Sequence, residues 1–593
     1  MTTKTIDNST LHGAILQGCH HVVTKKNALN AINFFPVADG DTGDNMAATA
    51  TAIISYSRPE TSVASTLQSI ADASIMGAHG NSGMIFSQFF NALIHDKLPD
   101  EHITIRDFSG ILTLAADGVR ASISNPVEGT ILTVIDAWAA SVHELADDHE
   151  CFKQLFHGTK PLLTSAVDST SRRINSHEEA EAVDAGALGF YHFIEGFAEF
   201  LINPGAMPVF EDTPILNASN HESHLIETQP KHRYCTEALL TSTQIDKKAL
   251  SDELNRFGDS VVLTANSRLC RFHIHTDDPS EVFKSLINQG LINYPKIDDM
   301  QRQFESLHER KQSIALVTDS GADIPQSLRD KFQIHLIPLN IHLDGHHFLD
   351  RNCFDPDEFY NTLASLKDYP RTSFPAKQLI EDKIRHLSSH YDQVIVISLS
   401  QVLSGIHNAF ASIAQKLDNV HVINSCLSSG AQGLLVVKAA ELIESGLDVD
   451  TIKSKLEEQK GKIFFFAMVN DVDSLVRSGR ISKLAGGVAR FSHIKPIFGF
   501  DPAGKAVLCS QAFSEKGALS KLITLVNHVQ EQEGMTLDRY CIVHAGIKEK
   551  AKEYSSLTHE GLKQEAAFIE PVSTAVGLHG GKGCVAIAAM MKI

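Results

Sequence analysis

The chain has 593 residues, and at roughly 100 to 200 residues per domain this length predicts about three or four domains. Its 52 Lys and Arg against 71 Asp and Glu give a net charge of −19, which opposes nonspecific attraction to nucleic acid or to anionic membranes. No apolar run approaches the roughly 18 residues of a spanning helix, the first residues lack the regions of a secretory signal, and the cysteines are sparse. We therefore expect a cytoplasmic enzyme or carrier that binds no nucleic acid and is not an integral membrane protein.

The predicted elements divide the chain into consecutive parts that differ in their pattern of helices and strands. Residues 1–202 carry apolar residues three and four apart, which predicts an all-helical domain, and residues 203–232, rich in Pro, Asn, Ser and His, predict a linker. Residues 233–305 predict a small α/β module with strands near "SVVLTA" and "LCRFHIHT". Residues 313–593 alternate apolar strands with amphipathic stretches, which predicts buried sheets covered by helices. The expected strands lie within 313–320, 334–345, 393–400, 420–425, 462–469, 539–546 and 584–591.

The stretch "VADGDTGDNM" places Asp39 and Asp41 two apart in a glycine-bearing loop ahead of a helical run. Carboxylates that converge in such a loop suit Mg²⁺, which takes one or two protein carboxylates while phosphates supply other ligands. The alternative is an Asx-turn that caps the helix near Asn45. Three further turns, "GAHGNSG", "NPVEGT" and "DAGALG", also precede apolar helices, whose free N–H groups favour an anion. These turns predict one site at the end of a helical bundle.

In their order, these motifs resemble the nucleotide-binding domain of the dihydroxyacetone kinase L-subunit (DhaL) type, in the version found in bacterial fatty acid kinase. The resemblance covers roughly residues 10–202 and implies a helical barrel that binds ATP through Mg²⁺. It implies Asp39 and Asp41 as metal ligands and catalytic residues. The candidate nucleotide contacts are Thr42, Asn45, Asn81, Ser82, Gly83, Thr130 and Asp184.

This chain departs from the family pattern at three cationic positions. The family usually has an arginine where His79 stands, a lysine where Asn125 stands, and a lysine-bearing turn where Leu188 lies. Either the phosphate charge is neutralised by other groups, such as those of the C-terminal part, or phosphotransfer is weaker or altered.

In the middle module, His273 and His275 lie two apart in an expected strand, so that both imidazoles point to one face. With Cys235 they could supply three zinc ligands, leaving a fourth position for water or another side chain. The alternative is that one histidine packs and the other is solvated. The stretch from "YCTEALL" to "HIHTDDPSEVF" resembles the middle domain of fatty acid kinase, which favours zinc. A catalytic and a structural role for the metal both remain open.

In the C-terminal part, hydroxyl, guanidinium and imidazole groups follow predicted strands, where open α/β sheets bind ligands. A guanidinium can pair with a carboxylate through two hydrogen bonds, so the set suits a carboxylate ligand. The alternative for each residue alone is a cap or a surface group. The candidate substrate contacts are Ser320, Thr372, Ser373, Ser400, Ser404, Arg477, Arg480 and His579.

The ordered set T-D-S-x-A-D-I-P, T-S-x-P, L-S-G, S-G-R-I-S-K and G-x-H-x-G resembles the DegV family of fatty-acid-binding proteins over about residues 313–593. The resemblance implies two α/β lobes that enclose an acyl chain, with the carboxylate near Thr372, Ser404, Arg480 and His579. Changes beside Ser404 and His579 affect chain preference more than carboxylate binding.

The chain therefore looks like a fusion of a fatty acid kinase with a DegV protein. We hypothesise that ATP phosphorylates a bound fatty acid to an acyl phosphate, with Arg480 and His579 as catalytic groups beside Asp39 and Asp41. The rivals are a fatty-acid-binding or sensing protein with an inactive kinase domain, and a kinase for a small molecule such as dihydroxyacetone. The family implies an acyltransferase of phospholipid synthesis as a partner. Transfer within one chain and transfer across a homodimer both remain open.

Overall fold

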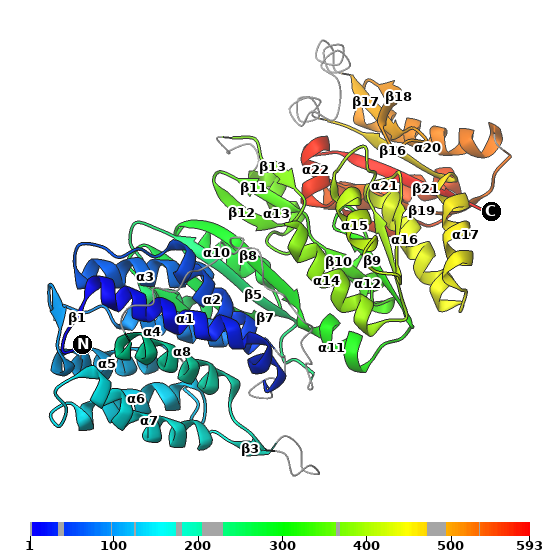
Figure 1. The fold of residues 1–593 in the computed structure, drawn as a ribbon. Coiled ribbons are helices and arrows are strands. Elements are labelled where there is room, and N and C mark those ends of the chain that lie inside the picture. Colours follow the sequence, from blue (N-terminus) through cyan, green and yellow to red (C-terminus); the bar gives the residue numbers. More distant parts are fainter. Residues whose placement is uncertain are drawn as a thin grey trace. The chain divides into compact units, whose positions relative to one another are not determined.

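The computed structural model describes residues 3–33, 41–96, 98–123, 126–173, 181–203, 229–362, 368–470, 494–532 and 534–592. It divides into two compact units, Met1–Phe304 and Glu305–Ile593 (Figure 1). The first unit contains both the predicted helical domain and the predicted middle module. Among the helices described, none is both long and apolar enough to cross a membrane.

The N-terminal part of the first unit is helical, as the periodicity predicts. Short strands pair at two places, β1 (Ile6–Asp7) with β2 (His102–Ile103) and β3 (Arg172–Arg173) with β4 (Glu181–Ala182). The helices are α1 (Asn8–Ala31), α2 (Thr42–Tyr56), α3 (Val63–Gly77), α4 (Gly80–Ala92), α5 (Ile105–Ala121), α6 (Ile131–Leu145), α7 (Phe152–Asp168) and α8 (Ala185–Ile202). Their apolar faces bury one core, in which Phe89, Trp138, Phe190 and Phe193 pack ring against ring.

The middle module adds an antiparallel sheet to these helices. Its strands lie in the order β6 (Gly258–Ala265), β7 (Leu269–Thr276), β5 (Tyr234–Thr241) and β8 (Leu291–Asp299). Helices α9 (Lys247–Leu254), α10 (Pro279–Leu286) and α11 (Met300–His308) complete it. The sheet packs on the helical part: Ser87 Oγ lies 3.1 Å from Thr264 Oγ1, and Val262 joins an apolar cluster with Ala78 and Met84. Side chains of the module therefore reach the start of α4.

The second unit begins with a lobe built on parallel strands. Their order is β10 (His335–Ile337), β9 (Ile314–Asp319), β14 (Gln393–Ser398) and β15 (Val420–Asn424), beside a smaller antiparallel sheet of β12 (His346–Leu349), β11 (Asn340–Leu343) and β13 (Arg371–Ser373). The helices are α12 (Gln326–Lys331), α13 (Pro356–Thr362), α14 (Lys377–His390), α15 (Ile406–Ala414), α16 (Ser429–Glu444) and α17 (Val449–Lys460). Buried apolar strands such as "VIVI" in β14 explain why helices cover this sheet.

The other lobe is a mostly antiparallel sheet, so the two-lobed α/β prediction is confirmed. Its strands lie in the order β18 (Ala506–Ala512), β17 (Lys495–Phe500), β16 (Ile463–Met468), β21 (Val585–Met591), β19 (Leu537–His544) and β20 (Phe568–Pro571). Helices α20 (Glu515–Gln532), α21 (Lys548–Leu562) and α22 (Thr574–Gly580) belong to this lobe. Each strand predicted in this half is present. In this half, strands β12, β13, β17, β18 and β20 were not predicted; in the first unit, the same holds for β5, β8 and the short strands β1 to β4.

Candidate functional site

The starts of several helices of the first unit meet at one place. Thr42 Oγ1, at the start of α2, lies 3.2 Å from Ser82 Oγ in the first turn of α4. A Cβ at Gly186, in the first turn of α8, would lie 3.8 Å from Ser82 Oγ and 3.4 Å from Ile131 Cβ at the start of α6. The predicted convergence of four polar turns is thus present. Helix starts expose unpaired N–H groups, so this place suits an anion.

The aspartates of the first motif differ in their surroundings. Asp41 precedes α2, and its side chain makes no capping hydrogen bond to that helix. Asp44 is buried, accepting hydrogen bonds from Lys26 Nζ at 3.1 Å and Asn30 Nδ2 at 2.7 Å. Asp44 is therefore a structural residue of the α1–α2 contact. Asp39 lies outside the described residues.

The other predicted nucleotide contacts have identifiable local roles. Thr130 Oγ1 donates to the Val127 carbonyl at 2.7 Å, and Asp184 accepts from the Ala187 N–H at 2.8 Å as the N-cap of α8. A Cβ at Gly83 would lie 2.7 Å from the Asn45 carbonyl oxygen, so glycine permits the close approach of α4 to α2. The Asn45 amide likewise lies against Gly80, which has a φ of +55°. Asn81 Oδ1 is buried and has no hydrogen-bond partner within the described parts of the chain.

A buried carboxylate, Glu237 on β5, joins the sheet module to α4. It accepts from the Gly80 N–H at 2.9 Å and from His273 Nδ1 at 2.9 Å, and it lies 3.7 Å from the Arg271 guanidinium. Burial alone would raise its pKa, but the contacts with the imidazoles of His273 and His79 and the charge of Lys296 outweigh burial and bring the pKa of Glu237 well below its usual range. Glu237 is thus an anion that fixes the module against the helix start.

A cysteine and two histidines of the module lie together beside Glu237. One ligand atom each from Cys235, His273 and His275 falls within 4.8 Å of the others, and Cys235 Sγ lies 3.7 Å from His273 Nδ1. Nε2 of His273 is buried and lacks a hydrogen-bond partner within the described residues. A histidine whose Nδ1 faces a carboxylate presents Nε2 to a metal in many metalloproteins. This set therefore fits Zn²⁺ in ligand type and arrangement.

The charge of Asp41 links this cluster to the helix starts. Lys296, on β8, pairs in register with Glu237 on β5 and lies 3.3 Å from Asp298. Burial opposes its positive charge, but the surrounding groups raise its pKa above the ordinary range. These groups are Asp298, Glu237, Cys235 and Asp41. The sheet module thus brings a half-buried cation close to the first aspartate motif.

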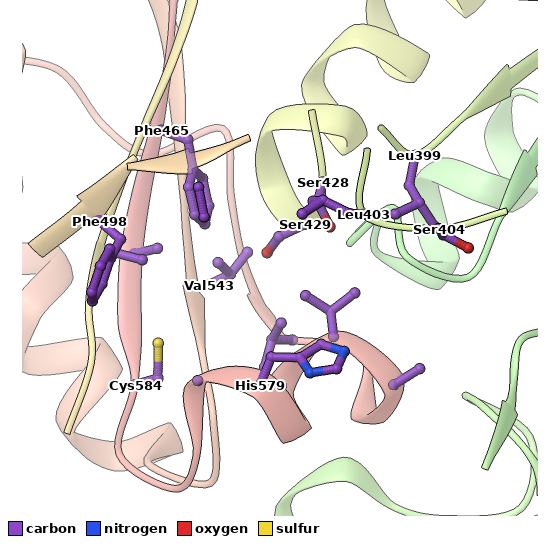
Figure 2. A pocket seen from close by; sticks show the side chains of 18 of the residues that line it. Leu399, Leu403, Ser404, Ser428, Ser429, Phe465, Phe498, Val543, His579 and Cys584 are labelled. Atoms are coloured by element: carbon purple, nitrogen blue, oxygen red, sulfur yellow. The ribbon is translucent and has the colours of Figure 1, made fainter. Parts of the chain in front are cut away.

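The second unit contains a separate, mostly apolar cavity of about 400 Å³ (Figure 2). The predicted residues Thr372, Ser373, Ser404 and His579 line it. Figure 2 shows the imidazole of His579 and the hydroxyl of Ser404 on one side, and the rings of Phe465 and Phe498 on the other. Other lining residues include Leu339, Leu399, Leu403, Val469, Phe500, Val543, Val572, Ala575, Val576 and Ala586. The polar groups Ser404 and His579 therefore lie on one side, with Leu399 and Leu403 beside Ser404, opposite the two phenylalanine rings.

Two predicted contacts need correction. Ser320 and Ser400 are not among the residues that line the cavity. The Ser320 hydroxyl is buried, donates to Asp350 at 2.5 Å and accepts from the Leu339 N–H at 3.0 Å. Ser320 therefore stabilises the end of β9 instead of contacting a ligand. Outside the described residues lie Arg477, Arg480 and Asn125.

Three polar residues of the cavity were missed in the sequence. Ser428 is the N-cap of α16 and Ser429 its first residue, after β15, and His544 ends β19. Ser428 and Ser429 follow a strand of the parallel sheet, a position that favours ligand contact, whereas His544 belongs to the sheet of the other lobe. The turn "NSCLSSG" after a predicted strand was the signal for Ser428, whereas nothing in "CIVHAG" distinguishes His544 from a packed residue.

Comparisons with protein families agree with the order of these parts. The DAK2 domain matches residues 36–199, the FakA-like middle domain of fatty acid kinase matches residues 231–307, and the DegV family matches residues 313–592. The fold is thus that of a kinase-like helical domain with its middle module, followed by a two-lobed α/β protein. The chain belongs to the DegV family through its C-terminal half, and the predicted fusion is confirmed.

Individual relatives match one half or the other. DegV of Bacillus subtilis is 30% identical over 284 residues, which cover 47% of this chain and all of DegV. YloV of Bacillus subtilis is 28% identical over 321 residues, covering 52% of this chain and 58% of YloV. This chain thus spans little more than half the length of YloV and of the similar Staphylococcus haemolyticus protein SH1689, at 54%. The crystal structure of Bacillus subtilis DegV, titled a fatty acid binding protein, covers 48% of this chain and 100% of that chain, with 30% identity and a TM-score of 0.43.

Proposed function

We propose that this protein is an ATP-dependent kinase that phosphorylates a fatty acid carboxylate bound in the second unit, giving an acyl phosphate and ADP. One observation carries the proposal: a single chain contains a cluster of helix starts suited to an anion in a DAK2 domain and an apolar cavity with polar groups on one side in a DegV half. Each part could bind its own ligand without the other part. Together they match a reaction between a nucleotide and a lipid acid.

The cavity supports a fatty acid as the acceptor. Its volume of about 400 Å³ lies in the usual range of roughly 300–1,000 Å³ for ligand pockets, and its walls are mainly aliphatic and aromatic. Its polar groups Thr372, Ser404 and His579 can donate hydrogen bonds to a carboxylate. The family resemblance implies that Arg480 also contacts the head group, where a guanidinium would neutralise the charge of the carboxylate.

The helix starts of the first unit support a nucleotide. We assign Asp41, together with Asp39, as the carboxylates that hold Mg²⁺; bound Mg²⁺ would neutralise the phosphate oxygens. The N–H groups at the starts of α2 and α4 suit the phosphates, with Thr42 and Ser82 beside them. Asp41 directly precedes Thr42, so its carboxylate belongs to the same end of the helical domain as these groups.

The reaction requires little acid–base chemistry from the protein. A carboxylate oxygen of the fatty acid attacks the γ-phosphorus, the bond from that phosphorus to the β,γ-bridging oxygen breaks, and ADP leaves with the electron pair. A carboxylate is already ionised at neutral pH, so no general base is needed. Positioning and charge neutralisation can therefore carry the transfer.

We further assign Cys235, His273 and His275 as the ligands of a zinc ion, which would supply positive charge close to Asp41. Glu237 then orients His273 through Nδ1. The family resemblance makes an acyltransferase of phospholipid synthesis the expected consumer of the acyl phosphate, in the cytoplasm.

One experiment separates this proposal from its rivals. The purified full chain is incubated with ATP, Mg²⁺ and a long-chain fatty acid, any acyl phosphate is trapped with hydroxylamine, and the assay is repeated with Asp41→Ala. Acyl hydroxamate that depends on Asp41 supports the proposal. Bound fatty acid without hydroxamate would indicate a binding protein with an inactive kinase domain. Phosphorylation of dihydroxyacetone instead would indicate a small-molecule kinase.

A further inference from the structure

His79, the N-cap residue of α4, is bound by a side chain of the sheet module. An Arg271 guanidinium nitrogen lies 2.8 Å from His79 Nδ1, although the two residues are 192 positions apart in the chain. Arg271 is buried, with a side chain that is 1% exposed, and Glu237 lies 3.7 Å away from it. A buried arginine is always charged and can only donate hydrogen bonds.

This contact fixes the protonation state of the imidazole. Glu237 Oε2 also lies 3.2 Å from His79 Nδ1, but Nδ1 cannot donate to Glu237 and accept from Arg271 at once. The shorter contact is with Arg271, so Nδ1 is the acceptor and the proton lies on Nε2. Glu237 is satisfied without His79, because the Gly80 N–H and His273 donate to it.

The charges around His79 favour the neutral ring. Burial, followed by the charge of Arg271, lowers the pKa of His79 to about 4; Lys296 acts in the same direction, and the carboxylate of Glu237 opposes them. These charged groups lie on strands β7, β8 and β5 of the sheet module, and α4 itself contains no charged residue. At neutral pH, His79 is therefore an uncharged donor whose N–H is at Nε2.

His79 lies next to the proposed phosphate site at the starts of α2 and α4. His79 directly precedes Gly80, Asn81 and Ser82, and Ser82 contacts Thr42 at the start of α2. Its side chain is 26% exposed, in contrast to Arg271 and Glu237, which are buried behind it. The ring is therefore not enclosed, and His79 adjoins the residues at the start of α4 where a ligand would lie.

We propose that His79 donates a hydrogen bond from Nε2 to the polyphosphate of ATP, and that Arg271 is the positioning residue that fixes this tautomer. The inference rests on the proposed nucleotide site but not on the identity of the phosphoryl acceptor. This arrangement explains why residue 79 need not be cationic. The guanidinium of Arg271, which contacts His79 Nδ1, supplies the positive charge instead.

The test measures binding of the Mg²⁺ complex of a non-hydrolysable ATP analogue to the full chain by calorimetry. His79→Phe removes the donor and is expected to weaken binding about tenfold, the cost of a hydrogen bond to a charged group. His79→Gln keeps a neutral N–H donor and is expected to bind within about threefold of the native protein. His192→Phe, on α8 beside Glu195, is the control and leaves binding unchanged.

Two further measurements distinguish a His79 that donates a hydrogen bond to the nucleotide from a His79 that only stabilises the fold. Arg271→Met weakens binding in the native background but has no additional effect in His79→Phe, because Arg271 acts through the imidazole. The ratio of native to His79→Gln affinity stays flat from pH 6 to 8, whereas an imidazolium would lose affinity as pH rises through its pKa.

Unchanged affinity in His79→Phe, or a ratio that falls with pH, would overturn the inference. Absence of nucleotide binding in the native protein would overturn both this inference and the proposed function. Nucleotide binding that depends on His79 without any acyl phosphate would support the inference while removing the kinase proposal.

Discussion

Both units place the starts of helices at their candidate sites, but the first site suits a charged ligand and the second suits an apolar one. In the first unit, the helix starts lie beside charged groups that the sheet module inserts, Glu237, Arg271 and Lys296. In the second unit, the short helix α22 and the start of α16 carry His579 and Ser428 into a cavity with apolar walls. A charged ligand needs groups from separate parts of the chain, whereas an acyl chain needs only space between two sheets.

This difference predicts that a single substitution in the site of the first unit causes a large loss of activity, whereas a single substitution in the cavity of the second unit causes a small loss of binding. Removing one charge from the cluster of Glu237, Arg271 and Lys296 leaves the other charges without a partner, and an unpaired charge in a buried site raises the free energy of the folded state. Changing one wall residue of a cavity alters only part of a large contact surface.

The largest effect is expected for Asp41→Asn. Loss of one carboxylate that holds Mg²⁺ should reduce the rate of acyl phosphate formation by about 10²- to 10³-fold, comparable with losing one electrostatic group of an active site. The rate is followed by hydroxylamine trapping. Asp117→Asn, an exposed residue of α5, is the matched control. Fatty acid binding should be unchanged in both variants, and a loss of binding in Asp41→Asn would show that the two units are not separate in function.

The metal content of the first unit gives the second prediction. Cys235→Ser should lower the zinc content of the purified protein from about one ion per chain towards zero, because a thiolate is lost from a three-ligand set. Elemental mass spectrometry measures this directly. Cys509→Ser changes an exposed cysteine and should leave the zinc content unaffected. Equal zinc in native protein and Cys235→Ser would exclude this cluster as the metal site.

Filling the cavity should have a smaller effect. Ala467, on β16, lines the cavity, and Ala467→Phe should weaken binding of a long-chain fatty acid about tenfold, since a ring occupies space for the chain. Shorter acids should lose less. Ala567→Phe places the same ring at an exposed position as a control. Nucleotide binding should be unaffected. Equal loss for short and long acids would indicate that the chain does not extend past Ala467.

The smallest prediction concerns the dependence of stability on pH. Burial raises the pKa of Asp319 to about 6, although the Leu399 N–H, the Gly321 N–H and Gln432 donate to it. The folded state therefore holds a proton that the unfolded chain releases near pH 4, so the contribution to stability is largest below pH 4 and is lost as pH rises to about 6. The change is of order 1–3 kcal/mol.

Asp319→Asn should flatten this part of the profile when thermal unfolding of the full chain is followed between pH 4 and 7. A profile that stays unchanged in the variant would show that another group causes the dependence.

The sequence predicted most of the fold because its signals are local. Buried strands such as "VIVIS" and helices with apolar residues three and four apart are recognisable without knowledge of their partners. The short or half-exposed strands β12, β13 and β18 were missed, because they become strands through pairing with neighbours that the sequence does not identify.

The candidate sites show the same limit. Motifs in the sequence pointed to Cys235 and His579, and the structure places Cys235 beside His273 and His275, and His579 in one cavity with Thr372 and Ser404. Ser320 also carries a motif, but its hydroxyl is turned into the protein by Asp350. The contact of Arg271 with His79 joins positions 192 residues apart and could be found only in the folded chain.

The most direct test of the proposed kinase activity is mass spectrometric detection of the acyl hydroxamate from the full native chain with ATP, Mg²⁺ and a mixture of saturated and unsaturated long-chain fatty acids. We predict a hydroxamate that matches the acid bound in the cavity and that is absent without ATP. A protein that binds both the nucleotide and the fatty acid but yields no hydroxamate, while ADP does not accumulate, would contradict the proposal.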